Sequence, residues 1–325
     1  GLLQLHILYP GANVAPSALF SSTLASARMR LGPLVHASQE RFLPLTIGDT
    51  VPPSTTHVIV GKIGGADIEN RAPHWLHQIA TALEDGTRVF VDYSDHHLET
   101  ESVMTPFYEQ LSLLSCDFVV PTTGLAQRLR TKFKSLVLHV IEDWLEYDMI
   151  APKVGVADIT RALWFGHPSN ARFLIDLLYI WPATKRHVEL KIVSTPQTLN
   201  IINGHSFSKI PNVEVSYTPW SLDVLPKLAN VCHCAVIPSD LKSPKRFASN
   251  NRLVTALALG LPTVATPLPS YEEFGRYFSA LSAETLAQVL EDPDSHCDSV
   301  SAFQSHYAKR FTLDSLSSQW QRIIV

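Results

Sequence analysis

The first half of the chain alternates short hydrophobic runs with longer stretches in which apolar residues recur at helical spacing. The runs lie at residues 3–9, 57–60, 87–92, 116–121 and 135–141. Runs dominated by apolar residues are typical of strands that are buried on both faces of a parallel sheet. Between two of them, Leu125, Leu129 and Phe133 recur every four residues and predict an amphipathic helix. The alternation predicts a parallel sheet with right-handed crossover connections.

The pattern is interrupted between residues 142 and 160, which are acidic and then contain Pro152 and Gly155. It resumes with strands predicted at residues 162–165, 187–194, 213–219, 231–238 and 263–266. Residues 312–325 carry apolar side chains at helical spacing and predict a closing amphipathic helix. Because a chain of 325 residues can bury two cores of ordinary size, we predict an α/β fold with two Rossmann-like domains, residues 1–150 and 151–325.

A basic loop followed by a short helix is the most informative stretch of the second half. We expect Ser249 to cap this helix and Gly260 to end it. The first amides of the helix, including those of Asn251 and Arg252, would then lack helical acceptors, and such a helix start favours an anion. With the loop cations, it would suit a pyrophosphate. The alternative is a solvated loop whose lysines contact nothing. The cations are Lys242, Lys245 and Arg246.

A second turn of the same kind opens the second domain. Gly166 follows the strand at 162–165, and Ser169 stands where it can cap the next helix. Since the carboxyl ends of parallel strands meet at one sheet edge, this turn and the basic loop are expected to converge, although an ordinary βα loop would look the same. Tyr217 and Trp220 end another strand and are candidates to stack on a nucleobase, with core packing as the alternative.

Ionisable groups crowd the end of the strand at 87–92. Asp92 ends this strand, and Asp95, His96 and His97 follow it. A histidine or aspartate at this edge would act as a base on an acceptor hydroxyl, or would hydrogen-bond a transferred sugar. The last three residues are therefore the catalytic candidates. The alternative is a helix-capping aspartate followed by exposed histidines.

Composition narrows the range of partners. Lys and Arg number 26 against 30 Asp and Glu, a net charge of −4, which argues against a general nucleic-acid binder. The four cysteines lie mostly in hydrophobic runs, so we expect core residues, and we prefer a strand to a metal site for the Cys232–Cys234 triplet.

No hydrophobic run is long enough to span a membrane and the start lacks a charged leader, so we expect a soluble, cytoplasmic protein. One basic helix is either a solvated face or a peripheral membrane contact; its cations are Arg128, Arg130, Lys132 and Lys134.

Residues 249–273, SNNRLVTALALGLPTVATPLPSYEE, resemble the donor-binding segment of group 1 GT-B glycosyltransferases of the retaining, glycogen-phosphorylase-like superfamily. The resemblance implies two Rossmann-like domains facing an interdomain cleft, with the last helix crossing back to the first domain. It implies a nucleotide-sugar donor held by the second domain, with Asn250 and Thr255 added to its donor-binding residues, and a glycan, lipid-linked or protein acceptor. It also implies catalysis without a metal or any other cofactor.

The loop after the first strand is on the acceptor side in GT-B enzymes. By resemblance, Gly11, Asn13 and Ser17 are acceptor-side candidates, although a plain turn is equally consistent. We also expect Ser17 to cap a helix that carries Arg28 and Arg30 near its end, where the helix dipole favours cations.

The chain departs from the commonest retaining signature at its two glutamates. Aligned through the helix and its terminal glycine, they become Phe247 and Thr255. Neither side chain reproduces a carboxylate that accepts two hydroxyl hydrogen bonds. We expect a glycosyltransferase of glycan or glycoconjugate biosynthesis. The alternatives are a catalytically silent GT-B-like subunit and a nucleotide-sugar epimerase.

Overall fold

The computed structural model describes residues 2–155, 158–205 and 210–325. Contacts divide the chain into two compact domains. The first contains the residues up to Glu146, together with Phe247–Ser249 and Lys309–Val325, and the second contains Tyr147–Arg246 and Asn250–Ala308. The boundary predicted from the sequence, between residues 150 and 151, stays a prediction.

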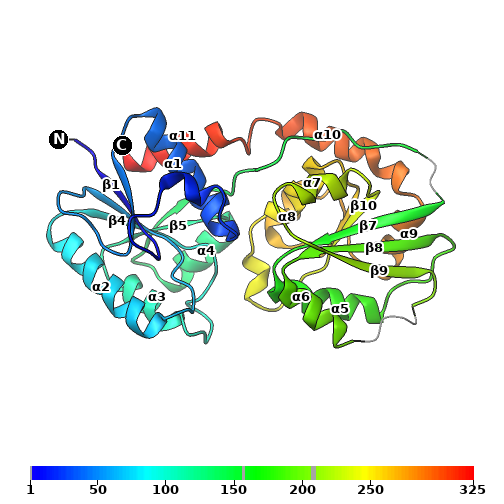
Figure 1. Ribbon diagram of the computed structural model, residues 1–325, viewed down its shortest axis with the longest axis horizontal. Helices are drawn as coiled ribbons and strands as arrows, with labels where there is room; N and C mark the ends of the chain where they lie inside the picture. The colour runs from blue at the N-terminus through cyan, green and yellow to red at the C-terminus, as the bar shows by residue number, and fades with distance from the viewer. Residues whose placement is uncertain (1, 156–157, 206–209) are drawn as a thin grey trace. The chain divides into compact units, whose positions relative to one another are not determined.

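The first domain is built on a six-stranded sheet with the strand order β2-β1-β3-β4-β5-β6, in which every pairing is parallel (Figure 1). The predicted parallel sheet is confirmed. The strands are β1 (Leu5–Leu8), β2 (Leu45–Gly48), β3 (His57–Val60), β4 (Arg88–Asp92), β5 (Asp117–Val120) and β6 (Val137–Val140). All four residues of β1 and of β3 are buried, which explains why these strands are mostly hydrophobic, with one histidine in each.

Helices cover both faces of this sheet. Helices α2 (Ile68–Glu84), α3 (Thr105–Ser112) and α4 (Thr123–Lys132) pack against one face, where Val58 and Val60 point. Helices α1 (Gly32–Glu40) and α11 (Leu313–Ile324) pack against the other, where Ile59 points. Successive side chains of a strand face opposite sides, so one hydrophobic run serves both layers.

The C-terminal helix completes the core of the first domain. Leu316, Trp320 and Ile324 are buried in it, and α11 lies beside α1 (Figure 1). The three positions follow helical spacing, so one face of α11 is apolar. The predicted return of the last helix to the first domain is confirmed.

The prediction of a helix capped by Ser17 is wrong. Residues 16–31 form a short 3-10 helix, η1 (Pro16–Leu19), and a π-helical turn, η2 (Ala27–Leu31), and Ser17 caps neither. Arg28 and Arg30 were expected near the end of that helix, where the dipole favours cations, but both lie in η2 and are buried in ion pairs. Acidic side chains distant in the sequence bind them, and the hydrophobic pattern carries no information about such pairs.

The second domain has a second parallel six-stranded sheet, with the order β12-β11-β10-β7-β8-β9. Its strands are β7 (Ile159–Phe165), β8 (His187–Ser194), β9 (Val213–Pro219), β10 (Cys234–Ile237), β11 (Thr263–Ala265) and β12 (Ser279–Ala280). The chain proceeds from β7 outward through β8 and β9, and later from β10 outward in the opposite direction. The strand order therefore reverses between β7 and β10, where open α/β sheets bind ligands at the carboxyl edge.

Short helices surround the second sheet. They are α5 (Ala171–Tyr179), α6 (Pro196–Asn203), α7 (Val224–Ala229), α8 (Asn251–Ala258), α9 (Ala283–Glu291) and α10 (Cys297–Tyr307). Gly260 follows α8 with a φ of +84°, and a Cβ there would lie 2.5 Å from the carbonyl oxygen of Ile150. The predicted glycine end of this helix is confirmed, because both the backbone conformation and the close approach require glycine.

The four cysteines are buried and unpaired, as expected for core residues. In the part of the chain that the structure describes, no helix combines the length and the apolar composition that crossing a membrane requires.

Candidate functional site

The site of the second domain lies at the carboxyl edge of its sheet, at the point where the strand order reverses. Gly166–Ser169 follows β7, and the basic loop follows β10, which is the next strand in the sheet. The two segments touch, because Nζ of Lys245 donates a hydrogen bond to Oγ of Ser169 at 2.9 Å. The predicted convergence of the two turns is therefore present in this domain.

Arg252, the second residue of α8, spans the same edge. Its Nε donates to the carbonyl oxygen of Phe165 at 2.9 Å, and its Nη2 donates to the same oxygen. The guanidinium also lies over the Trp164 ring, 5.4 Å from the centroid. Gly166 makes room for it, since a Cβ there would lie 2.9 Å from Nη2. A glycine is therefore needed after β7 because the Arg252 side chain packs directly against this position.

The charge of Arg252 is not balanced by a carboxylate among the described residues. The guanidinium contacts one carbonyl oxygen and two aromatic rings. Burial lowers the pKa of Arg252, while Tyr271 has a smaller opposing effect. Arg252 is half-buried, and a partly desolvated cation without a counter-ion is destabilising, so this position favours an anionic ligand.

The start of α8 adds to this preference. Asn250 is the N-cap residue, and its side chain makes no capping hydrogen bond. The amides of the first turn have no intrahelical acceptors, and the helix dipole places partial positive charge there. The helix start and Arg252 both favour negative charge at this edge.

Ser249 is not the N-cap that we expected. It is grouped with the first domain, and its hydroxyl donates to Oδ2 of Asp143 at 2.7 Å. Because the hydroxyl is used in this way, the cap position moves to Asn250. Thr255 is buried one turn into the helix, with Oγ1 3.4 Å from Oδ1 of Asn251. No carboxylate takes the position of the second glutamate of the family signature.

The rest of the basic loop is held by its own backbone. Asp240 accepts hydrogen bonds from the amides of Lys242 and Ser243, at 2.9 and 3.1 Å. The amide of Lys242 is the main cause that lowers the pKa of Asp240. Nη1 of Arg246 donates to the carbonyl oxygen of Lys242 at 3.1 Å. The loop is thereby folded on itself, and the guanidinium of Arg246 is held by a backbone carbonyl oxygen.

The two base-stacking candidates lie near the same edge. Tyr217 Oη donates to the carbonyl oxygen of Ser194 at 3.1 Å, and its ring packs against the core of the second domain. The amide of Trp220 donates to the same carbonyl at 2.9 Å. Ser194 Oγ in turn donates to the carbonyl oxygen of Gly166 at 2.6 Å. Stacking of either ring on a base stays a prediction.

Ser169 is not the helix cap that we expected. Its backbone amide donates a hydrogen bond to Nδ1 of His167 at 3.1 Å.

The catalytic candidates of the first domain follow β4 and have different environments. Asp95 is 53% exposed and accepts a hydrogen bond from Nζ of Lys62 at 2.6 Å. His96 is buried, with Nδ1 2.8 Å from Tyr93 Oη and Nε2 2.7 Å from Oε2 of Glu99. Both ring nitrogens of His96 are therefore occupied, which suits a structural role.

His97 differs from His96 in leaving one ring nitrogen open. Nδ1 lies 3.1 Å from Ser102 Oγ, and the ring stacks on Tyr108 with centroids 5.0 Å apart and an interplanar angle of 3°. Nε2 has no hydrogen-bond partner among the described residues. Burial lowers the pKa of His97, Lys62 and His96 lower it further, and Asp95 opposes them. A neutral imidazole with an open nitrogen is a competent proton acceptor.

The acceptor-side candidates occupy the loop after β1. Gly11 has a φ of +118°, and its amide donates to Oδ2 of Asp49 at 2.9 Å. Asn13 has a φ of +50° and Ser17 lies in η1. The hydrogen bonds of this loop describe a well-defined turn, and an acceptor role stays a prediction.

A buried ionic network at the end of β4 was not predicted. Arg30 contacts Asp92 at 3.0 Å and Asp143 at 3.2 Å, and Nη1 donates to the carbonyl oxygen of Ile141. Burial raises the pKa of Asp92, although Arg30 opposes this effect. Nearby, Arg28 pairs with Glu146 at 2.7 Å. The two pairs join residues 62 and 118 positions apart, so no local sequence signal could have revealed them.

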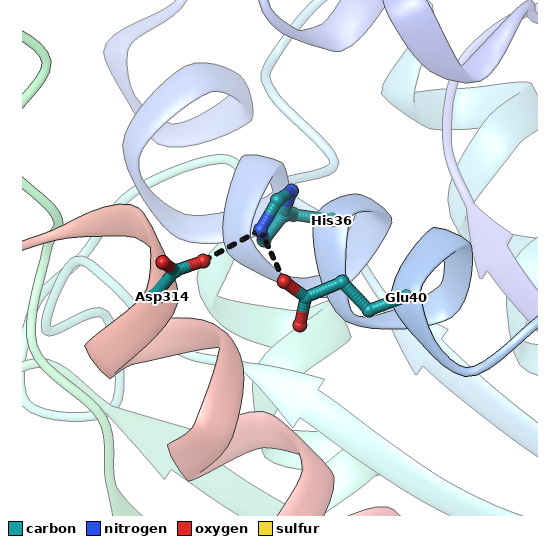
Figure 2. A group of neighbouring side chains, drawn as sticks. All are labelled: His36, Glu40 and Asp314. Atoms are coloured by element: carbon teal, nitrogen blue, oxygen red, sulfur yellow. Dashed lines mark hydrogen bonds and ion pairs between the residues drawn. The ribbon is translucent and has the colours of Figure 1, made fainter.

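A smaller cluster joins α1 to α11 (Figure 2). Nε2 of His36 lies 2.9 Å from both Oε1 of Glu40 and Oδ1 of Asp314. The side chains of Glu40 and Asp314 are 46% and 81% exposed. Three such ligands could hold a metal ion, but a histidine shared between two carboxylates accounts for the same contacts.

No protein-family model matches the sequence, and no curated protein matches it. Solved structures do match. The Anabaena protein Alr3699/HepE, solved with UDP and glucose, has 11% sequence identity and a TM-score of 0.63, with 99% of each chain covered. A DNA-modifying beta-glucosyltransferase, solved with and without uridine diphosphoglucose, has 11% identity and a TM-score of 0.52, with 99% of each chain covered.

TarM has 9% identity and a TM-score of 0.59, over 82% of this chain and 54% of its own. This chain therefore spans about half the length of TarM. At these identities the likeness concerns the fold alone. Together with the two parallel sheets and the returning C-terminal helix, it establishes that the chain has the GT-B fold.

Proposed function

We propose that the chain is a glycosyltransferase that moves a sugar from a nucleoside-diphosphate sugar to an acceptor hydroxyl. The observation that carries the proposal is the position of Arg252 at the carboxyl edge of the second sheet, beside Gly166 and without a carboxylate among the described residues. A diphosphate supplies the missing negative charge, and Lys245 and the start of α8 extend the same site.

Uridine diphosphate is the donor nucleotide that we favour. HepE was solved with UDP, and the beta-glucosyltransferase with uridine diphosphoglucose. This step is an analogy between folds, since fold does not determine substrate. The analogy makes UDP the first nucleotide to test.

Stabilisation of the leaving diphosphate is the main catalytic contribution of the second domain in this proposal. When the bond between the sugar and the diphosphate breaks, negative charge grows on the diphosphate oxygens. A fixed guanidinium, a lysine and helix amides aimed at that charge stabilise the transition state by several kcal/mol. These groups take the role that a divalent cation has in other transferases, so we propose metal-independent transfer.

For the acceptor, we favour a glycan, a lipid-linked sugar or a protein hydroxyl. With a net charge of −4, the chain is not suited to general binding of a polyanion. The matching beta-glucosyltransferase modifies DNA, so a duplex oligonucleotide belongs in any acceptor panel.

The proposal is tested by calorimetric titration of the purified chain with UDP, GDP, dTDP and CDP. We expect one nucleotide to bind, and expect Arg252→Gln and Lys245→Ala to weaken it about tenfold or more, since hydrogen bonds to charged groups contribute roughly 1.5–3 kcal/mol. Lys227→Ala is the matched control, because this exposed lysine of α7 has no recorded partner in the described chain. Absence of binding by the wild-type chain, or equal binding by the Arg252 variant, would contradict the proposal.

The absent glutamates bear on the alternative of a silent subunit. Thr255 is buried and Phe247 is apolar, so neither can replace a carboxylate. Incubation of the chain with the bound UDP-sugar and an acceptor panel, with and without EDTA, separates the possibilities. Transfer in EDTA supports a metal-independent enzyme, binding without turnover supports the silent subunit, and a new UDP-sugar formed without acceptor supports an epimerase.

A further inference from the structure

The loop after β4 contains a chain of hydrogen bonds that ends on His97. Nδ1 of His97 lies 3.1 Å from Ser102 Oγ, which lies 3.1 Å from Thr105 Oγ1. Thr105 Oγ1 lies 3.0 Å from the carbonyl oxygens of His97 and Thr100. A carbonyl oxygen only accepts hydrogen bonds, so the single hydroxyl proton of Thr105 is directed to these carbonyls.

The remaining protons then follow a consistent order. With its own proton used, Thr105 Oγ1 accepts from the hydroxyl of Ser102, and Ser102 Oγ accepts from Nδ1–H of His97. This arrangement places the proton of the neutral imidazole on Nδ1. Nε2 then carries the lone pair, and it is the nitrogen with no hydrogen-bond partner among the described residues.

The ring of His97 is also held in one plane. It stacks on Tyr108, which is buried, with an interplanar angle of 3°. Among the described residues, the charged and titratable groups around it are Asp95, Lys62 and His96, the phenol of Tyr108 on which the ring stacks, and the phenol of Tyr93, which accepts a hydrogen bond from the His97 amide. Burial lowers the pKa of His97, which favours the neutral form of the ring. The neighbouring His96 cannot take the same role, since both of its nitrogens are engaged.

We propose that His97 is the general base that deprotonates the acceptor hydroxyl, and that Ser102 and Thr105 are positioning residues that fix its tautomer. The inference rests on the proposed function. In the step, the acceptor O–H bond breaks and its proton passes to Nε2. The acceptor oxygen forms a bond to the anomeric carbon. The bond from that carbon to the diphosphate breaks, and its electron pair leaves with the diphosphate.

The tautomer is read directly, without activity, by long-range ¹H–¹⁵N spectra of histidine-labelled protein. At pH 8 we expect the His97 ring of the wild-type chain to be protonated on Nδ1. Ser102→Ala removes the acceptor of that proton and should shift the ring toward the Nε2–H form. Ser112→Ala is the matched control, because Ser112 Oγ donates only to the carbonyl oxygen of Glu109. A wild-type ring protonated on Nε2 would overturn the assignment.

Transfer kinetics supply the second readout. His97→Gln should lower kcat/KM about 10²- to 10⁴-fold, the usual contribution of a general base, while UDP binding is unchanged. His77→Gln, at an exposed site on α2, should change neither. In Ser102→Ala, the acidic limb of the pH–rate profile should move together with the tautomer.

The outcomes separate this inference from the proposed function. A wild-type chain that transfers sugar while His97→Gln keeps at least about a third of its activity refutes the base and leaves the transferase standing. A wild-type chain that neither binds UDP nor transfers refutes both. If the acidic limb of the pH–rate profile of Ser102→Ala stays at the wild-type position, the positioning role of Ser102 is refuted.

Discussion

Substitution of Gly166 by alanine separates ligand binding from folding in the second domain. The added Cβ would lie 2.9 Å from Nη2, 3.0 Å from Cζ and 3.2 Å from Nε of Arg252. These distances are too short, so the guanidinium must leave its place on the Phe165 carbonyl. The group that moves is the end of a flexible side chain, and the backbone does not have to follow.

The expected cost in stability is therefore small. Overpacking costs about 1–3 kcal/mol, and the lower end applies because an arginine side chain can reorient. Alanine also restricts the unfolded chain, which returns about 0.4–1 kcal/mol. The net loss is then about 0.5 kcal/mol or less, which corresponds to a Tm decrease of at most roughly 2 °C for a domain of this size.

The expected cost in binding is larger. A hydrogen bond to a charged group contributes about 1.5–3 kcal/mol, so loss of the guanidinium from the phosphate should weaken UDP binding roughly 10- to 150-fold. Calorimetric titration measures the binding, and differential scanning calorimetry measures Tm. Gly124→Ala is the control, because a Cβ at this α4 position meets nothing within 4 Å. It should leave UDP binding unchanged and raise stability by some tenths of a kcal/mol.

Two results would refute this reasoning. If Gly166→Ala binds UDP as the wild-type chain does, Arg252 is not held at a phosphate site by the space that Gly166 leaves. If the variant loses more than about 3 kcal/mol of unfolding free energy, the glycine has a backbone role that the geometry does not suggest.

Three further predictions concern the first domain. Arg30→Met should lower the free energy of unfolding by about 3–5 kcal/mol in urea titrations, because it leaves Asp92 and Asp143 buried without their cation; a loss below 1 kcal/mol would mean that both acids are protonated. The pKa of Glu99 is lowered from 4.5 to about 2, chiefly by a hydrogen bond from an arginine, so its stabilising effect is complete above pH 4.5 and is lost as the pH falls toward 2. Glu99→Gln should flatten the stability profile in that window, and an unchanged slope would contradict the shift. His36→Ala should change stability by less than about 1 kcal/mol, and zinc should not raise the Tm of the wild-type chain, because an exposed histidine–carboxylate cluster contributes little; a zinc-dependent rise that the variant lacks would instead identify a metal site.

Strands such as β1, β3, β10 and β11 were predictable because each is a local hydrophobic run that is buried on both faces. The edge strands β6 and β9 are only partly buried, but their apolar residues still marked them in the sequence. Strand β2 gives a weaker signal, since only two of its four residues, Ile47 and Gly48, are buried. The region after β1 was predicted incorrectly for another reason. Its backbone is fixed by Arg28 and Arg30, whose acidic partners come from β4 and from the segment after β6. Pairing across such separations is not encoded in local periodicity.

The candidate donor site was predictable in its residue types but not in its contacts. Hydrophobic spacing and the final glycine located α8, and Arg252 was recognised at its start. The cap was assigned to Ser249, yet its hydroxyl binds Asp143, 106 residues away. Nor could sequence show that Gly166 accommodates Arg252, because that relation depends on the adjacency of β7 and β10 in the sheet.

The electrostatics of the two sheets support the proposal that the two substrates bind to different domains. At the carboxyl edge of the first sheet, the buried cation Arg30 is neutralised by Asp92 and Asp143, and the exposed Asp95 is paired with Lys62. Because each of these cations already has a carboxylate partner, this edge suits a neutral hydroxyl acceptor better than an anion. At the equivalent edge of the second sheet, Arg252 contacts a carbonyl oxygen and aromatic rings but no described carboxylate. Binding a diphosphate there would neutralise a half-buried charge, whereas binding it in the first domain would require an existing ion pair to break, and this difference supports our proposal that the donor binds to the second domain.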